Sequence, residues 1–230
     1  YRLWMKSNRI FYKKADRIYT ITDGMAENLA KYCDKCKIKV VSLWPSSNFN
    51  KLVSRADNRF IKIHGLQNQF IVQYSGNFGK GHNLHLMVDL AERMKEEDNI
   101  KFIIIGDGWN KNDLIDEAKN RQLNNILFLP FQPANILSHS LSSAHIAFVS
   151  VSNELANLCI PSKIYNLLKL EIPLLGSASQ KSDLSKLIKE SNFGQCFEIN
   201  QIEGMCDFIR KMNNDIIYYQ QVKTIFIYIL

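Results

Sequence analysis

The sequence predicts an α/β protein: a Rossmann-like parallel sheet with helices on both faces, preceded by the remnant of a second Rossmann-like domain. From residue 69 to residue 212, short apolar runs alternate with segments of helical periodicity, a pattern typical of strand-helix-strand units. Upstream, a strand, a helix and a strand are expected at 17–21, 25–32 and 38–43. The apolar runs that we predict to be strands of the main sheet are 70–74, 101–105, 126–129, 146–149, 173–176 and 195–199.

The segments between these runs have the spacing of amphipathic helices. After the first run, Leu84, Met87 and Val88 begin a helical spacing of apolar residues, and charged residues take the opposite side. Such a helix packs its apolar side on a sheet. Further helices are expected at 112–120, 134–141, 163–170, 182–189 and 202–212, which makes one doubly wound domain.

Four parts of the chain can be distinguished. We expect residues 1–44 to be the last elements of an N-terminal domain, so that the chain begins midway. Residues 45–68 are polar and predict a linker, residues 69–212 form the main domain, and residues 213–230 form a C-terminal tail or helix. The apolar run at its end is far shorter than the ~20 residues that a membrane-spanning helix needs. A final core segment or an altered tail is the expected explanation.

Charge and cysteine content restrict the partners. A balance of 29 Lys and Arg against 22 Asp and Glu gives +7, which suits phosphate-bearing ligands, anionic lipid surfaces or nucleic acid. No nucleic-acid module can be found, so we expect no nucleic acid partner. Five irregularly spaced cysteines fit a reducing compartment, the cytoplasm. Cys33 and Cys36 lack a second pair at metal-ligand spacing, so no metal is expected.

The first candidate site is the loop 75–82, because ligands of open parallel sheets bind beyond the carboxyl ends of the strands. Gly76 and Gly79 allow a ligand to approach the backbone, and Lys80 supplies charge for a phosphate. His82 follows closely and is the histidine of most interest. A tight strand-to-helix turn with a solvated lysine explains the pattern equally well.

Two further positions follow predicted strands. Gly106 and Gly108 could let a ligand pack against bare backbone, although Asp-Gly is an ordinary turn pair and a structural role is favoured for them alone. Phe131 could stack on a base, although loop aromatics more often pack.

The third candidate loop, 153–163, leads into a predicted helix. Pro161, Ser162 and Lys163 would begin that helix with a capping hydroxyl, unpaired backbone donors and a cation, which together suit a diphosphate. Upstream, Glu154 could accept hydrogen bonds from sugar hydroxyls. The alternatives are a simple cap, a solvated lysine and a solvated glutamate.

Taken in order, these segments resemble glycosyltransferase family 4, and within it a subgroup of bacterial polysaccharide enzymes similar to N-acetyl-L-fucosamine transferases. The resemblance covers nearly the whole chain and is weakest over 44–68 and after about residue 212. Each motif is modest, but their order is specific. The segments are ADRI (15–18), TDGM (22–25), KIKVV (37–41), YSGNFGKGHNL (74–84), IGDG (105–108) and IPSKIY (160–165).

The resemblance implies the C-terminal domain of a GT-B fold, which holds a nucleotide-diphosphate sugar and retains anomeric configuration without a metal or other cofactor. By position, Lys80 and the helix start at Pro161, Ser162 and Lys163 would hold the diphosphate. Gly76 and Gly79 would admit it, with Gly106 and Gly108 beside them. Glu154 would contact the donor sugar, and Phe131 would lie near the base.

Departures from the family pattern qualify this expectation. The family often has Arg where this chain has Asn77, and Glu where it has Asn166, so a phosphate cation and a ribose-binding carboxylate are replaced by amides. His145 replaces a common aspartate, and the segment 169–171 replaces small residues.

The implied function is transfer of a sugar, favouring a UDP-sugar, to a lipid-linked or polysaccharide acceptor in bacterial surface polysaccharide or O-antigen synthesis. The +7 charge would suit peripheral docking at the inner face of the plasma membrane. A companion chain could supply an N-terminal domain. Two alternatives stay open: a degenerate, non-catalytic nucleotide-sugar-binding domain or partner subunit, and a UDP-sugar epimerase.

Overall fold

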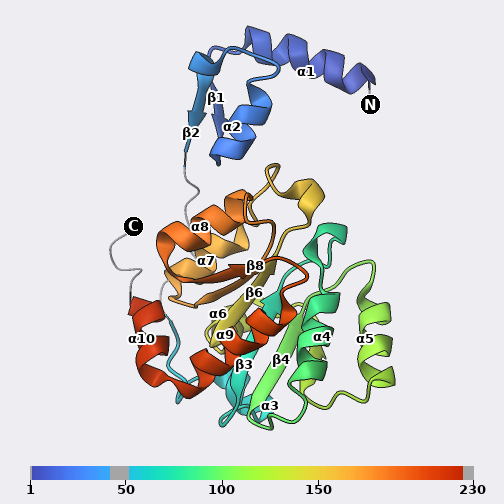
Figure 1. Cartoon of the computed structure of the whole chain (residues 1–230), viewed down its shortest axis with the longest axis vertical. Coiled ribbons are helices and arrows are strands. Elements are labelled where there is room, and N and C mark those ends of the chain that lie inside the picture. The colour runs from blue at the N-terminus through green and yellow to red at the C-terminus, as the bar shows by residue number, and fades with distance from the viewer. Residues whose placement is uncertain (1, 42–51, 225–230) are drawn as a thin grey trace.

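The computed structural model describes residues 2–41 and 52–224 and contains a main sheet and a small separate one (Figure 1). The main sheet is parallel throughout, with strand order β5-β4-β3-β6-β7-β8. The predicted doubly wound sheet is therefore confirmed, and the predicted strand bounds differ from the observed ones by at most two residues. The strands are β3 (Phe70–Ser75), β4 (Ile100–Ile105), β5 (Ile126–Leu129), β6 (Ile146–Ser150), β7 (Leu174–Ser177) and β8 (Gly194–Phe197).

Helices cover both faces of this sheet. Because side chains of a strand alternate between faces, Val72 and Tyr74 of β3 point into the apolar core under α4 and α9, whereas Ile71 points into the core under α3. A third cluster under α7 and α8 completes the second face. The helices are α3 (Arg59–His64), α4 (His85–Arg93), α5 (Lys111–Asn120), α6 (Ala134–Leu141), α7 (Lys163–Lys169), α8 (Asp183–Ser191), α9 (Ile202–Asn214) and α10 (Ile216–Thr224).

The sheet is most loosely paired at its centre. The β3–β4 ladder runs over six residue pairs, from Phe70 to Ser75, but the β3–β6 ladder has only two, at Val72 and Gln73. Beyond Gln73, β3 and β6 separate toward their carboxyl ends. The strand order also reverses between β3 and β6, which is the point where open α/β sheets bind ligands.

The segment 45–68, predicted as a linker, contains the helix α3. Asn58 caps this helix by accepting a hydrogen bond from the backbone N–H of Ile61, and Gly65 ends it in the left-handed conformation. Phe60 and Ile61 are buried against the sheet. The helix spans six residues, too few to show a helical period among polar neighbours. The predicted tail 213–230 contains the helix α10, whose Tyr219 packs edge-on against Phe70.

The N-terminal unit consists of α1 (Arg2–Lys14), β1 (Ile18–Thr20), α2 (Asp23–Leu29) and β2 (Ile38–Val40), with β1 and β2 pairing in parallel. Thr22 caps α2 by accepting a hydrogen bond from the backbone N–H of Met25. The unit contacts the main domain where Asn28 Nδ2 donates to the Asn157 carbonyl over 2.9 Å. The end of the predicted strand 38–43 and the final run 225–230 lie outside the described residues.

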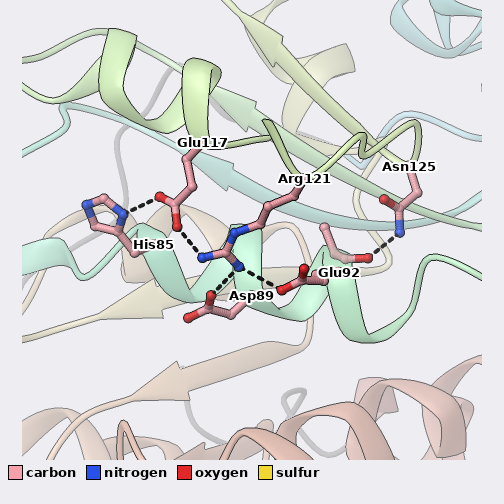
Figure 2. Close-up of polar contacts among 7 residues, drawn as sticks. His85, Asp89, Glu92, Glu117, Arg121 and Asn125 are labelled. Atoms are coloured by element: carbon pink, nitrogen blue, oxygen red, sulfur yellow. Dashed lines mark hydrogen bonds and ion pairs between the residues drawn. The ribbon is translucent and has the colours of Figure 1, made fainter. Parts of the chain in front are cut away.

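A charged network joins α4 to α5 at the surface of the main domain (Figure 2). The Arg121 guanidinium donates to Asp89 over 2.7 Å and to Glu92 over 2.9 Å, and it also pairs with Glu117. Glu117 in turn contacts His85 Nδ1 at 2.6 Å. The hydrogen bond to Asp89 and the neighbouring carboxylates raise the pKa of Arg121, which stays charged and holds the two helices together.

Candidate functional site

Lys163 lies in the crevice between β3 and β6. Its Nζ donates to the Ser75 carbonyl over 3.3 Å and lies 3.5 Å from the centroid of the Tyr74 ring. Burial lowers the pKa of Lys163 to about 7, because taking an ammonium group out of water disfavours its charged form. In the described parts of the chain, no carboxylate is paired with it. The crevice therefore holds an amine that is partly protonated near pH 7 and has no neutralising partner.

A cavity of about 150 Å³ adjoins Lys163. Asn166 also lines this cavity, so the positions expected to meet the diphosphate and the ribose lie at one place in the fold. The remaining lining is largely apolar and comes from β3, β6, α6 and α7: Gln73, Ser75, Leu137, Leu141, Ala147, Phe148 and Leu167.

The expected capping hydroxyl of Ser162 is wrong. Ser162 occupies the N-cap position of α7 but has helical backbone angles, φ −58° and ψ −23°, and its side chain makes no capping hydrogen bond. A side-chain cap needs an extended backbone at this position, as at Thr22 and Ser182. Ser162 is exposed and Pro161 is half-buried, beside the Lys163 that enters the crevice.

The loop after β3 is held from inside by Tyr74, which is fully buried. Its hydroxyl oxygen lies 2.5 Å from the Asn77 carbonyl and 2.6 Å from His82 Nδ1. Burial and the nearby charge of Lys163 lower the pKa of His82, so its ring is neutral at neutral pH. Sequence reasoning noted His82 but missed Tyr74. The available signal was a polar-tipped aromatic residue in an apolar strand directly before a glycine loop.

Close contacts explain why glycine stands at several positions of the site loops. A Cβ on Gly106 would lie 1.9 Å from the Gly76 carbonyl oxygen, and one on Gly108 would lie 2.5 Å from the Phe78 carbonyl oxygen. The loops after β3 and β4 thus touch backbone to backbone. At Gly76, with φ +149°, a Cβ would lie 3.2 Å from Lys163 Nζ. At Gly79, by contrast, a Cβ would make only ordinary contact with the His82 ring, at 3.6 Å.

Lys80 and Glu154 lie on two short helices that adjoin, η2 (Lys80–His82) and η3 (Asn153–Leu155). The helices are joined where the Ser152 backbone donates to the Gly81 carbonyl over 2.8 Å. Both side chains are exposed at the rim of the site. Lys80 Nζ lies 5.1 Å from the centroid of the Trp109 ring. Hydrogen bonds from Ser152 and its own backbone lower the pKa of Glu154, which is therefore a carboxylate.

Phe131 stands apart from these residues. It follows β5 at the edge of the sheet, with β4 between β5 and β3, and 52% of it is exposed. Its assignment to a base stays a prediction.

Across residues 2–41 and 52–224, no cluster of three or more His, Cys, Asp or Glu has metal-binding geometry. No helix in these ranges has the length and apolarity needed to cross a bilayer.

The chain belongs to the family described as glycosyl transferases group 1, whose model matches residues 56–225. That segment contains the whole main sheet and every candidate site residue. Its lower bound also places α3 with the matched domain rather than with a connection.

Among curated proteins, the probable glycosyltransferase WbjE of Pseudomonas aeruginosa is 24% identical over 195 residues, which are 84% of this chain and 48% of the relative. An N-acetylgalactosamine-N,N'-diacetylbacillosaminyl-diphospho-undecaprenol 4-alpha-N-acetylgalactosaminyltransferase of Campylobacter jejuni is 23% identical, over 90% of this chain and 53% of the relative. The chain thus spans about half the length of these relatives.

Solved structures show the same fold. WaaG, a glycosyltransferase involved in lipopolysaccharide biosynthesis, has a TM-score of 0.79 at 13% identity, over 98% of this chain and 62% of that chain. HepE of Anabaena, in complex with UDP and glucose, has a TM-score of 0.75 at 14% identity, over 96% and 60%. The C-terminal domain of LpcC from Francisella tularensis has a TM-score of 0.60 at 12% identity, over 80% and 91%. The main domain has the fold of a GT-B C-terminal domain.

Proposed function

We propose that this chain is the donor-binding part of a retaining glycosyltransferase of family 4 that takes its sugar from a nucleotide diphosphate, a UDP-sugar, without a metal ion. The observation that carries this proposal is Lys163 in the switch-point crevice. A lysine that contributed only to stability would not be expected in a place where burial disfavours its charge and no carboxylate compensates. An incoming diphosphate would supply the missing negative charge.

The chemistry explains why a cation would be needed there. When the bond between the anomeric carbon and the diphosphate oxygen breaks, its electron pair goes to the diphosphate. The acceptor hydroxyl oxygen bonds to the same face of the sugar, and its proton passes to the leaving diphosphate oxygen. Positive groups fixed around the leaving diphosphate lower the barrier to this step. Lys163 would serve from inside the crevice and Lys80 from its rim, in place of a metal.

The other site residues would take the roles that their positions allow. The backbone at Gly76, Gly79, Pro161 and Ser162 would border the diphosphate, with Gly106 and Gly108 keeping the neighbouring loops close together. Asn166, in the cavity beside Lys163, would contact the ribose. The carboxylate of Glu154 would accept hydrogen bonds from sugar hydroxyls, and Phe131 would approach the base.

For the donor and acceptor, the comparisons provide support by analogy. The solved complexes of HepE contain UDP-glucose or UDP with glucose, and the name of the Campylobacter relative specifies a diphospho-undecaprenol-linked substrate. We therefore favour a UDP-sugar donor and a lipid-linked or glycan acceptor in bacterial surface polysaccharide synthesis. The reaction would take place in the cytoplasm at the inner face of the membrane, with an N-terminal domain contributing the acceptor side.

A second candidate, a non-catalytic nucleotide-sugar-binding domain, is favoured by the two amides at Asn77 and Asn166. Both stand where the resembled family has charged groups, and Asn77 is exposed. Such a domain would bind the donor more weakly and transfer nothing.

Calorimetric titration with UDP, GDP and ADP in the presence of a chelator tests the proposal. We expect saturable binding of UDP that Lys163→Ala abolishes. Lys186→Ala, which removes the same charge from an exposed position on α8, should change the affinity little. If none of the nucleotides binds, or if the two variants behave alike, the proposal is wrong. Binding of UDP without sugar transfer after an N-terminal domain is supplied would favour the second candidate.

A further inference from the structure

Tyr74 is the side chain at which the site loops meet. Its ring contacts Lys163, which begins α7, and Phe78, with an edge-to-face centroid distance of 6.0 Å. Phe78 donates a backbone hydrogen bond to Asp107 over 2.8 Å and bridges Gly108, so the loop after β4 is attached as well. One buried residue therefore connects the segments that follow β3, β4 and β6.

The hydroxyl of Tyr74 fixes a proton arrangement in the loop. Its oxygen, the Asn77 carbonyl oxygen and His82 Nδ1 form a triangle with separations of 2.5, 2.6 and 2.9 Å. The carbonyl can only accept, so the Tyr74 hydroxyl donates to it. A bare Nδ1 would then face acceptor lone pairs at both other corners. The arrangement is satisfied when Nδ1 carries a hydrogen, which leaves Nε2 of the neutral His82 ring as the unprotonated nitrogen.

The partners of Lys163 stabilise its ammonium without neutralising it. An aromatic face and a carbonyl oxygen attract a cation through a quadrupole and a dipole, and neither has a formal charge. A carboxylate in the same place would hold Lys163 more tightly but would also repel a diphosphate. A π face is therefore the kind of support that leaves the charge of Lys163 available to an anion.

We propose that Tyr74 is a positioning residue of the donor site, which seats the Lys163 ammonium on its ring and fixes the loop 76–82 through its hydroxyl. This inference rests on the proposed function, because the anion to be bound is the donor diphosphate. Tyr74 does not touch the donor; it acts through Lys163, Asn77 and His82.

Three variants separate this role from simple core packing. Tyr74→Phe keeps the ring and removes the hydroxyl, and Tyr74→Leu removes both. Phe102→Leu is the matched control, because Phe102 is an equally buried aromatic residue in the same apolar cluster but on β4. Each is measured in two ways: nitrogen chemical shifts of His82 and the titration of the Lys163 amine by NMR of the free chain, and UDP affinity by calorimetry.

In Tyr74→Phe, we expect the Nδ1 shift of His82 to change, because Nδ1 loses its hydroxyl partner and keeps only the Asn77 carbonyl, while the Lys163 titration stays in place. In Tyr74→Leu, we expect the pKa of Lys163 to fall below that of the unmodified chain, and UDP affinity to fall about tenfold, the scale of a desolvated cation–π contact. Phe102→Leu should move neither signal and should change UDP affinity less than about twofold, because a packing defect beside Val72 acts on stability rather than on the ring under Lys163.

Equal losses of UDP affinity in Tyr74→Leu and Phe102→Leu would overturn the proposal, as would unchanged His82 shifts in Tyr74→Phe. Should Tyr74→Leu fail to fold, the Tyr74→Phe variant still decides through the His82 shifts. If the unmodified chain binds none of UDP, GDP and ADP, the proposed function fails, and the role of Tyr74 in donor binding fails with it. The NMR measurements on the free chain distinguish that outcome from an error in the geometry.

Discussion

Lys163 and Arg55 are partly buried basic residues at opposite ends of the main sheet, and they differ in the number of hydrogen-bond partners. Lys163, at the carboxyl ends of the strands, has one carbonyl and an aromatic face. Arg55, at the amino ends, donates to four backbone carbonyls, those of Leu66, Gln67, Gln69 and Ser143, over 3.2 to 3.4 Å.

Arg55 is therefore a structural cation, whereas the amine of Lys163 has few partners within the fold. The planar guanidinium of Arg55 donates to carbonyls just before β3 and β6, and its bonds to Leu66, Gln69 and Ser143 are partly buried. Its charge is thus used inside the fold. Lys163 loses hydration on folding and gains only one carbonyl and one aromatic face as partners. The amino-terminal end of the sheet uses its cation for stability, whereas the carboxyl-terminal end holds a lysine whose charge the proposed donor diphosphate would neutralise.

The largest expected effect is the loss of the Arg55 hydrogen bonds. Arg55→Met should lower the free energy of unfolding by about 2–4 kcal/mol, because the partly buried carbonyls of Leu66, Gln69 and Ser143 lose a charged donor. Urea denaturation of this variant beside Arg59→Met, an exposed arginine of α3, measures it. If Arg55→Met is no less stable than Arg59→Met, the assigned structural role is wrong.

The next largest effect is a loss of stability in acid, caused by His145 at the amino ends of the strands. Its His145 Nδ1 accepts a hydrogen bond from the Ile71 backbone over 2.9 Å, and burial, Arg55 and Lys223 lower the pKa of His145 to about 3. Below pH 6.5 the unfolded chain therefore binds a proton that the folded chain does not. The free energy of unfolding should fall by about 2 kcal/mol from pH 7 to pH 5.

Urea denaturation at the two pH values, with His145→Gln as the comparison, tests this contribution. The variant keeps an acceptor but cannot titrate in this range, so its stability should depend less on pH. An unchanged pH dependence would mean that other groups cause the acid sensitivity.

At the other end, Lys163→Met should raise the free energy of unfolding by about 1–2 kcal/mol at pH 7, because a buried, unpaired ammonium is replaced by an apolar chain of similar length. The folded-state pKa of Lys163, about 7, lies below the unfolded value of 10.5. Stability of the unmodified chain should therefore rise with pH between these values, and Lys163→Met should lose that rise.

Denaturation of both chains at pH 7 and pH 9 measures the effect. A loss of stability in Lys163→Met at pH 7 would show that Lys163, like Arg55, is a structural cation, and the comparison between the two ends would fail.

The smallest effect is expected at the rim. Trp109 is 65% exposed and its contact with Lys80 is open to solvent, so Trp109→Ala should change the free energy of unfolding by less than about 0.5 kcal/mol. A change above 1.5 kcal/mol would place the rim contact among the structural interactions.

Much of the fold could be predicted because its signals are local. Apolar runs and helical spacing predicted the main elements nearly to the residue. The order of strands in the sheet and the short β3–β6 ladder depend on contacts between distant segments, so periodicity cannot reveal them. Helix α3 was missed because its capping Asn58 and terminal Gly65 enclose a segment shorter than two helical turns.

The sequence identified candidate residues of the site, but it could not show which of their side chains are buried and which are exposed. Lys163 was singled out for its place after a strand, yet nothing local shows that its side chain turns inward while that of Lys80 faces solvent. The same holds for Gly106, whose need for glycine comes from the Gly76 carbonyl of another loop. Tyr74 was missed because its partners lie in the loop and in α7 rather than in its own strand.

The short β3–β6 ladder divides the main sheet into two three-stranded halves joined by two residue pairs. Opening of the domain by local unfolding should therefore begin along this central line, where the fewest ladder hydrogen bonds must break. A nucleotide bound in the crevice would contact both halves at once and oppose that opening, so it would act as a removable cross-link. Amide protons along β6 should then report occupancy of the site through slower exchange with solvent, even without turnover.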